Sequence, residues 1–383
     1  MSERAVYLDN HATTRVDPRV VEAMLPYWSE TYGNAASVSH VFGEEAASAV
    51  ESARAQIAAL LNATPRDIVF TSGATEANNL AIKGVIQAAG SGVHLIVNAA
   101  EHRAVLDPAR KLKRLGCKLT VLPVDKYGMV DPQAVAAAIQ PNTALVSVMF
   151  ANNEVGTINP VAKIGEICRE RGVPFHCDAV QAVGRISLDL AKLPIDLLSL
   201  TAHKLYGPMG VGALCIRCGE KRVPIEPLFD GGGHERRMRS GTLPVPLIVG
   251  FGKACELAAE CMRDESIRIE QLRNRLWCGL SEAVVGVSVN GHPRRRLAGN
   301  LNVSFDNVDG DALMMSLRDI AVSSGSACTS ADPQPSHVLR AMGVSDTLTR
   351  ASLRFGLGRF TTPDDVEFAI TYVTDAIGRL RGL

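Results

Sequence analysis

Strand-like and helix-like segments alternate between about residues 65 and 218, and this alternation limits the possible folds more than any other feature of the chain. The runs DIVF, HLIV, TALVSVMF and IDLLSL are apolar on both faces, and helical patterns separate them. Strands of this kind belong to sheets that are covered by helices on both sides. The sequence therefore predicts a parallel α/β sheet.

The predicted helices follow these strands. One is expected from about Glu76 and another over about 106–115. A third has Asp131 as its N-cap and Pro132 at its first position. The region from about 245 to 283 is helical throughout and is expected to connect two domains. Beyond it, the run LNVSFDN, a helix at about 311–318, the run ASLRFGLGRF and a helix after Pro363 indicate a smaller α+β unit, which the N-terminal segment is expected to join or approach.

Charge and cysteine usage exclude several classes of partner. The chain has forty basic and forty acidic residues among 383, so bulk charge suggests neither nucleic-acid nor membrane binding. No apolar run has the length of a signal peptide or a membrane span, which favours a cytoplasmic protein with nine reduced cysteines. CIRC at 215–218 could be a metal or redox pair. It ends a strand-like run and has no second CxxC, so we expect no metal site.

Polar residues follow the predicted strands, and in an open α/β sheet ligands bind at that edge. TSGATEANN, after DIVF, leads into a helix N-terminus that can bind a phosphate, unless Thr75 simply caps the helix. No dinucleotide or P-loop motif is present. The other strand ends are followed by His102, by Asn152 and Asn153, by Asp178 and Gln181, and by His203 and Lys204.

Lys204 follows a buried strand and precedes a glycine-rich loop, HKLYGPMGVG. Such a lysine either extends its ammonium to the surface or serves as a carbonyl-reactive amine. A reactive lysine, a carboxylate at Asp178 for a protonated nitrogen, a histidine and a phosphate site are together what a pyridoxal phosphate enzyme requires. The strand ends therefore predict this cofactor, held by Lys204.

Several long motifs occur in an order that resembles the cysteine desulfurases of the iron–sulfur-cluster and nitrogen-fixation type (group I), within class V of the fold-type I pyridoxal phosphate enzymes. They include YLDNHATTRVDP, TSGATEANNLAIKG, EHRAVLD, ANNEVGTINP, HKLYGPMGVGAL, GGGHERRMRSGTLPV, SSGSACTSA and SLRFGLGRFTT, and they span nearly the whole chain. The resemblance implies a large domain at 15–258 with a mostly parallel seven-stranded sheet. It also implies a smaller α+β domain formed by 1–14 and 259–383.

The resemblance also implies roles for individual residues. Lys204 would form the Schiff base and move the Cα proton, and His102 would stack on the cofactor ring. Asp178 would pair with the pyridinium nitrogen, and Arg354, assisted by Asn34, would bind the substrate carboxylate. Phosphate contacts would come from Ala74, Thr75, Thr201 and His203, contacts to the phenolic oxygen from Asn153 and Gln181, and a phosphate contact in the neighbouring subunit from Thr242.

Cys328 would be the catalytic thiol, in a loop at about 322–335 that consists of small residues, glycine and prolines. The implied reaction converts L-cysteine to L-alanine and leaves a persulfide on Cys328. The persulfide sulfur would pass to an acceptor such as an iron–sulfur cluster scaffold, and the enzyme would be a homodimer. Ala35 replaces a usual proline, and Thr201-Ala202 replaces a common serine-glycine pair.

Three alternatives to this function remain open from the sequence. An aminotransferase of the same fold needs no loop cysteine and would release a keto acid. A selenocysteine lyase would use the same cofactor on a selenium substrate. A non-catalytic partner in cluster assembly would have a degenerate site, whereas Lys204, Asp178, His102 and Cys328 are all present.

Overall fold

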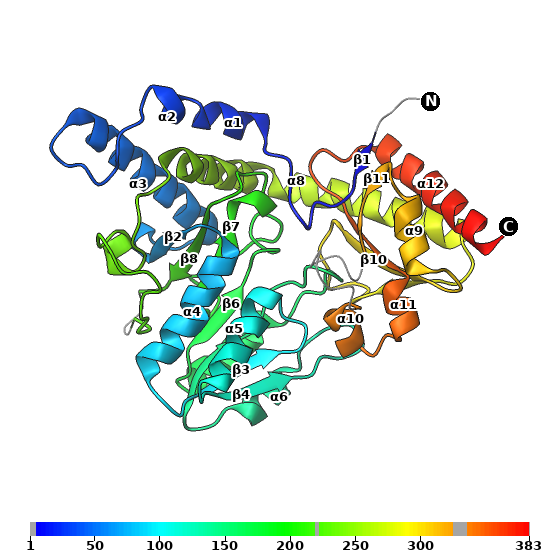
Figure 1. Cartoon of the computed structure of the whole chain (residues 1–383), viewed down its shortest axis with the longest axis horizontal. Helices are drawn as coiled ribbons and strands as arrows, with labels where there is room; N and C mark the ends of the chain where they lie inside the picture. Colours follow the sequence, from blue (N-terminus) through cyan, green and yellow to red (C-terminus); the bar gives the residue numbers. More distant parts are fainter. Residues whose placement is uncertain (1–4, 219–221, 325–334, 383) are drawn as a thin grey trace.

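A computed structural model describes residues 5–218, 222–324 and 335–382. Figure 1 shows a large part that contains the main sheet and a smaller part that contains the C-terminus. Among the described residues, no helix combines the length and apolar character needed to cross a membrane.

The main sheet has seven strands in the order β2-β8-β7-β6-β5-β3-β4. Only β8 runs antiparallel to its neighbours, and the other pairs are parallel. The prediction of a mostly parallel seven-stranded sheet is therefore confirmed. The strands are β2 (Ile68–Thr71), β3 (His94–Asn98), β4 (Lys118–Leu122), β5 (Thr143–Ser147), β6 (Phe175–Asp178), β7 (Leu197–Thr201) and β8 (Gly212–Ile216).

Helices cover both faces of this sheet because alternate residues of each strand point in opposite directions. In β2, Val69 packs in a core with residues of α4 and α5, whereas Phe70 packs in a core with residues of α3, α7 and α8. The helices of the large part are α1 (Pro18–Met24), α2 (Pro26–Ser29), α3 (Val41–Leu61), α4 (Ala74–Ala89), α5 (Arg103–Arg114), α6 (Pro132–Ala138) and α7 (Val161–Glu170).

Two of these helices begin earlier than the sequence suggested, and one begins as predicted. The N-cap of α4 is Gly73, so the helix begins at Ala74 and not near Glu76. The N-cap of α5 is His102, whose ring accepts a hydrogen bond from the amide of Ala104, and histidine is not among the usual capping residues. Asp131 caps α6, as predicted.

The smaller part is built on an antiparallel sheet in the order β12-β13-β10-β9. Its strands are β9 (Val287–Asn290), β10 (Asn300–Phe305), β12 (Ser323–Ser324) and β13 (Ser352–Gly356). A separate parallel pair joins β1 (Val6–Tyr7) to β11 (Ile320–Ala321), so the N-terminal segment contributes to this part. Its helices are α9 (Gly310–Ser316), α10 (His337–Ala341), α11 (Asp346–Arg350) and α12 (Pro363–Arg381).

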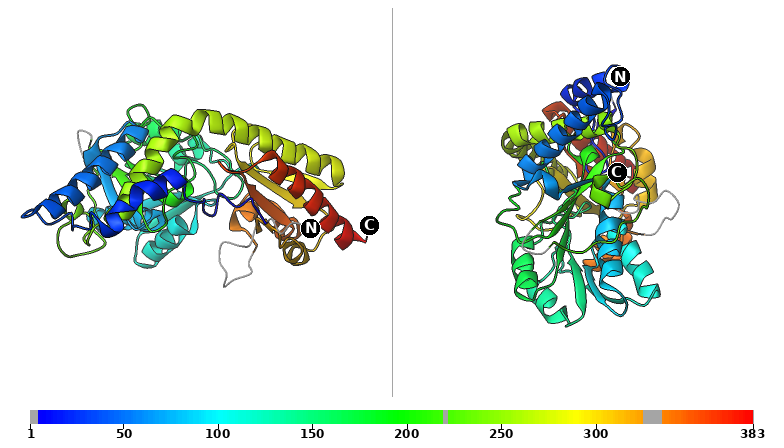
Figure 2. Two further views of the ribbon diagram at one scale, coloured as in Figure 1. Left: turned by 90° about the horizontal axis from the view of Figure 1, so that it is seen from above. Right: turned by 90° about the vertical axis from the view of Figure 1, so that its left-hand side faces the viewer.

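Helix α8 (Val245–Ala283) runs from one part into the other, as Figure 2 shows. Its bounds match the predicted connecting helix. Residues up to Ala258 pack in a core of the large part, and residues from Ile269 pack in the core of the smaller part together with Val6 and Leu8. The domain boundaries at 14/15 and 258/259 stay a prediction, and this division of the core favours them.

Candidate active site

A cavity of about 770 Å³ lies at the carboxyl ends of several strands of the main sheet and extends to β12 and β13 of the smaller part. Strands β6 and β7 and the segments that follow β2, β3 and β5 supply residues to it, as expected for an open α/β sheet. The structure brings most of the predicted site residues together here. Those that line the cavity are Ala74, Thr75, His102, Asn153, Asp178, Gln181, Thr201, His203, Lys204 and Arg354.

The N-terminus of α4 forms one end of the cavity. Its N-cap, Gly73, has no side chain to bond the first turn, and Thr75 is the second residue of the helix. The alternative that Thr75 caps this helix is therefore wrong. The first amides of a helix have no partner within it and carry positive partial charge, so this end can bind an anion.

Gly212 allows the Gly73 loop to lie close to the sheet. Gly212 pairs with Thr71 of β2 and Thr201 of β7. A Cβ atom at Gly212 would lie 2.7 Å from the Cα of Gly73 and 2.7 Å from the carbonyl oxygen of Leu200. Only a glycine in β8 leaves room for the loop that leads into α4.

Asp178 lies at the end of β6 and is almost fully buried. Its carboxylate accepts hydrogen bonds from Asn78 Nδ2 at 2.7 Å and from the amide of Val180 at 3.1 Å. No described basic side chain forms a salt bridge with it. A buried carboxylate of this kind is stabilised by a cationic hydrogen-bond donor, and the cavity is where such a donor can bind.

His102 and Glu101 follow β3, and burial changes the pKa of both. Burial lowers the pKa of His102, while the nearby Asp178 carboxylate acts in the opposite direction. Burial, followed by the charge of Asp178, raises the pKa of Glu101 well above its usual value. His102 Nδ1 accepts a hydrogen bond from the Ala104 amide at 3.0 Å, so in the neutral ring the proton lies on Nε2.

Lys204 ends the short 3-10 helix Ala202–Lys204 that follows β7. Its ammonium does not extend away from the protein. Instead, Nζ donates hydrogen bonds to the carbonyl oxygens of His11 and Ala12, both on the cavity wall. This geometry favours the interpretation as a site lysine over the interpretation as a surface lysine.

Arg354 lies on β13 and reaches the cavity from the smaller part. Its Nη2 donates hydrogen bonds to Asp9 Oδ1 and to Ser323 Oγ, each at 2.7 Å, and its Nη1 donates to the carbonyl oxygen of Asn153 at 3.0 Å. Its Nε is buried and has no partner among the described residues. A guanidinium fixed in this way can bind an anion in the cavity.

Comparison with known proteins then gives the family. The family model for class-V aminotransferases matches residues 6–368. The chain belongs to the class-V aminotransferase family. A cysteine desulfurase IscS of Anaeromyxobacter dehalogenans is 54% identical over 98% of this chain and 93% of the relative. The human cysteine desulfurase is 50% identical over 99% of this chain and 83% of the relative.

Solved structures agree with this assignment. A structure described as a NifS-like protein superposes with a TM-score of 0.92 at 38% identity, covering 98% of this chain and all of the other. The resemblance to cysteine desulfurases, the predicted fold class and the predicted cofactor, pyridoxal phosphate, are confirmed by these relationships.

The cavity of this class-V chain fits pyridoxal phosphate. Four of its lining residues have buried polar atoms without a partner among the described residues: His11 Nε2, Asn78 Oδ1, Asn153 Oδ1 and Arg354 Nε. Buried polar atoms are almost always hydrogen-bonded, so these atoms indicate a polar ligand. The helix N-terminus suits a phosphate, Asp178 suits a ring N–H and Lys204 suits an aldehyde.

Two predicted site residues do not line this cavity, and a third lies outside the described residues. Asn34 and Thr242 are exposed and are not among the lining residues. Cys328 lies outside the described residues, as does most of the predicted loop at 322–335. In CIRC, Cys215 is buried and Cys218 is exposed, and the expectation that this pair holds no metal stays a prediction. In the described parts of the chain, no three histidine, cysteine or acidic residues are grouped as metal ligands.

Sequence reasoning missed several residues around Lys204. His11 is buried beside Gln181, and Gln181 Nε2 donates to the carbonyl oxygen of His11 at 3.0 Å. Arg185 donates to the side chains of both residues and to the carbonyl oxygen of Asn10. These bonds occupy Gln181, so its contact with the phenolic oxygen stays a prediction. The only signal was the polar motif DNHATT after a short strand-like run.

Proposed function

We infer that this class-V enzyme is a pyridoxal-phosphate-dependent cysteine desulfurase that converts L-cysteine to L-alanine and passes the sulfur to an acceptor. The observation that carries this conclusion is 50–54% identity to proteins named cysteine desulfurase, over nearly the whole chain. The cavity supports it, because groups suited to a phosphate, a ring nitrogen, an aldehyde and a carboxylate all face the same space.

Bound pyridoxal phosphate supplies an aldehyde for an amine to condense with and a ring that accepts electrons from bonds to Cα. We assign the following roles to the chain. Lys204 holds the cofactor and then moves the proton of the substrate Cα. Asp178 would keep the ring nitrogen of the bound cofactor protonated, and the neutral ring of His102 would contact the cofactor ring. The phosphate binds at Ala74, Thr75, Thr201 and His203.

Arg354 binds the carboxylate of cysteine, because its buried Nε has no partner among the described residues and a guanidinium N–H forms a strong, charge-assisted hydrogen bond to a carboxylate. Asn153 Oδ1, which is buried and unpartnered within the described structure, accepts a hydrogen bond from the ligand. The thiolate of Cys328 forms a bond to the substrate sulfur while the Cβ–S bond of the substrate breaks. The electron pair of that bond stays with the carbon, which is then protonated to give alanine, and the persulfide remains on Cys328.

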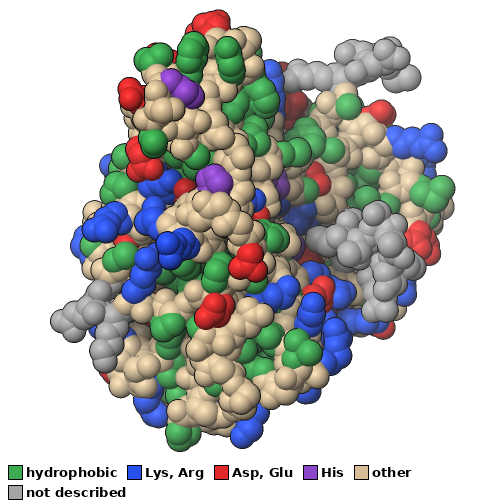
Figure 3. Space-filling view, turned by 60° about the vertical axis from the view of Figure 1, so that its left-hand side comes forward, with side chains coloured by type: hydrophobic (Ala, Val, Ile, Leu, Met, Phe, Trp, Pro, Cys, Tyr) green, Lys and Arg blue, Asp and Glu red, His purple; other side chains and the backbone are tan. Residues whose placement is uncertain are grey.

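We propose that two chains form a homodimer in which each completes the site of the other. Asn34 and Thr242 do not line the cavity of their own chain, and this supports the proposal that they contact the cofactor or substrate bound to the partner chain. Exposed apolar side chains also gather around α2 and the start of α3, at the top of the view in Figure 3. They are Leu25, Trp28, Tyr32, Val38, Val41 and Phe42, of which Tyr32 is 68% exposed and Val38 is 87% exposed.

An apolar patch of this kind is typical of a surface covered by a partner.

For the sulfur acceptor, we propose an iron–sulfur cluster scaffold protein, as the resemblance implies. The cytoplasmic location stays a prediction from the sequence.

The activity is tested by incubating the holoenzyme with L-cysteine and a reducing thiol and measuring the products. We expect alanine and sulfide in equal amounts. A keto acid in place of alanine would instead identify an aminotransferase. A parallel assay with selenocysteine tests the lyase alternative, which a strong preference for the selenium substrate would support.

Two variants test the assigned residues. Lys204→Ala should lose borohydride-trappable cofactor, and its turnover should fall by orders of magnitude. Cys328→Ala should keep its fold and its cofactor absorbance but should release almost no alanine and carry no persulfide by mass spectrometry. Alanine release at the wild-type rate by Cys328→Ala would remove the thiol from the mechanism.

A further inference from the structure

Lys204 lies in a turn whose two ends are both bonded to Thr14. The turn runs from His203 to Tyr206, and Thr14 is a buried residue that lies 189 positions earlier in the chain than His203. Thr14 Oγ1 donates to the carbonyl oxygen of His203 at 2.9 Å and accepts from the amide of Tyr206 at 2.8 Å. The amide of Thr14 donates to the same His203 carbonyl oxygen at 2.9 Å. One threonine therefore bridges the residues on either side of Lys204.

The turn needs this support because Tyr206 has a left-handed backbone conformation, with φ of 64°. A bulky residue rarely adopts this conformation, which is strained unless the surroundings hold it. Thr14 bonds the Tyr206 amide, and the amide of Asp17 donates to the Tyr206 carbonyl oxygen at 2.9 Å. Relaxation of Tyr206 to a negative φ would rotate the turn and move the Cα of Lys204.

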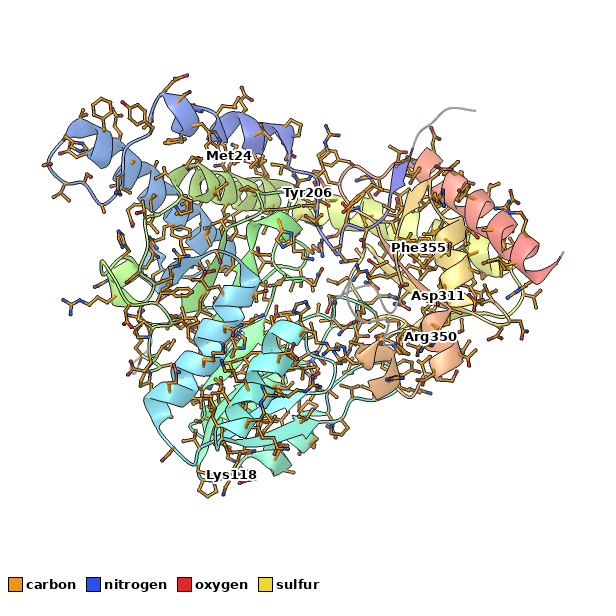
Figure 4. All side chains as sticks on the ribbon, viewed as in Figure 1. Met24, Lys118, Tyr206, Asp311, Arg350 and Phe355 are labelled. Atoms are coloured by element: carbon orange, nitrogen blue, oxygen red, sulfur yellow. The ribbon has the colours of Figure 1, made fainter. Side chains whose placement is uncertain are left out.

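The ring of Tyr206 is also fixed. Its hydroxyl oxygen accepts a hydrogen bond from the amide of Arg359 at 2.6 Å, and the Arg359 guanidinium lies 4.2 Å from the ring centroid. Figure 4 shows Tyr206 at the junction of the large and small parts of the molecule. The side chain is therefore held from the smaller part and the backbone from the segment that contains Thr14.

The same N-terminal segment also receives the ammonium of Lys204. The carbonyl oxygens of His11 and Ala12, which lie three and two residues before Thr14, accept hydrogen bonds from Lys204 Nζ. The backbone and the amine of Lys204 are thus both placed by residues 11–14, although Thr14 itself does not line the cavity.

We propose that Thr14 is a positioning residue for Lys204. Its hydroxyl holds the turn from His203 to Tyr206 in the strained conformation that directs the lysine amine to the cofactor aldehyde. This inference rests on the role of Lys204 given above, and it adds a residue that acts through the backbone without touching cofactor or substrate.

The test compares Thr14→Val, which keeps the shape but removes the hydroxyl, with Thr14→Ser, which keeps the hydroxyl. The first measurement is the rate at which the apoprotein forms borohydride-trappable cofactor at Lys204 after pyridoxal phosphate is added. Because a misplacement of about 1 Å can cost up to about a hundredfold in rate, we expect this rate and kcat to fall by about ten- to a hundredfold in Thr14→Val. The KM for cysteine should stay within about threefold.

Thr14→Ser should restore both rates to near the wild-type value. Thr349→Val is the matched control, since Thr349 is fully buried in the smaller part and its hydroxyl has no partner among the described residues. It should leave the trapping rate and kcat unchanged. If Thr14→Val does not fold, Thr14→Ala takes its place, and the trapping rate and kcat of Thr14→Ala are compared with those of Thr14→Ser.

The inference is overturned if Thr14→Val or Thr14→Ala traps cofactor at the wild-type rate, or if Thr14→Ser is as slow as the variants without a hydroxyl. Lys204→Ala, measured in parallel, separates this result from a failure of the proposed function. If Lys204→Ala still traps cofactor at the wild-type rate, at another lysine, the role of Lys204 is wrong. If only the Thr14 variants behave as wild type, Lys204 keeps its role and Thr14 has none.

Discussion

Replacement of Gly212 by alanine should weaken cofactor binding without changing any polar group in the cavity. The new Cβ would lie 2.7 Å from the Gly73 Cα and from the Leu200 carbonyl oxygen, whereas ordinary contacts begin at 3.4 Å. The Gly73 loop would have to move by the difference, about 0.7 Å, and it would carry the first turn of α4 with it. Overpacking of this kind costs about 1–3 kcal/mol.

The expected result is an increase in the Kd for pyridoxal phosphate of about tenfold or more, because about 1.4 kcal/mol corresponds to a factor of ten. Equilibrium dialysis of the apoprotein measures this Kd directly, and thermal unfolding of the apoprotein measures the cost to the fold. We expect the melting temperature of the apoprotein to fall as well, since the clash is present without ligand.

Gly378→Ala is the matched control, because this glycine lies within α12 and a Cβ there would meet no atom within 4 Å. Alanine in a helix interior is more favourable than glycine by about 0.5–1 kcal/mol. The control should therefore raise the melting temperature slightly and leave the Kd unchanged. A wild-type Kd for Gly212→Ala would refute the argument that a glycine is needed at this position of β8 to leave space for the Gly73 loop.

Three further predictions follow from buried charges. The pKa of Glu101 in the folded state lies above its ordinary value of 4.5, so ionisation of this carboxyl opposes folding. The free energy of unfolding of the wild type should therefore fall relative to that of Glu101→Gln as pH rises above about 4.5. Denaturant titrations of both proteins at several pH values check this. Glu235→Gln should lower the free energy of unfolding by about 3–5 kcal/mol, because Glu235 and Arg54 form a buried ion pair at 2.7 Å. Glu51→Gln removes an exposed partner of Arg54 and should lower it by less than about 1 kcal/mol in the same urea unfolding assay. Arg354→Lys should raise the KM for cysteine by about tenfold in steady-state kinetics, and an unchanged KM would exclude it as the carboxylate site.

The sequence by itself determined the elements and the main chemical groups. The helix at 245–283, the N-cap at Asp131 and the strand before Lys204 were predicted because hydrophobic period, capping residues and strand ends are local properties. The rule that ligands bind at the carboxyl ends of strands then grouped His102, Asp178 and Lys204, and the cavity contains all three. Motif resemblance supplied Arg354, which no local pattern would have selected.

Tertiary structure alone decided how these groups are held. Asp9 bonds Arg354 from 345 positions away, and Thr14 bonds both sides of Lys204 from nearly 190 positions away. The antiparallel direction of β8 and the pairing of β1 with β11 were likewise not predicted. Local periodicity specifies which face of an element is buried, but the partner of a buried polar atom depends on which distant segment packs beside it. For that reason the reactive groups could be found in the sequence, whereas the residues that position them became visible only in the folded chain.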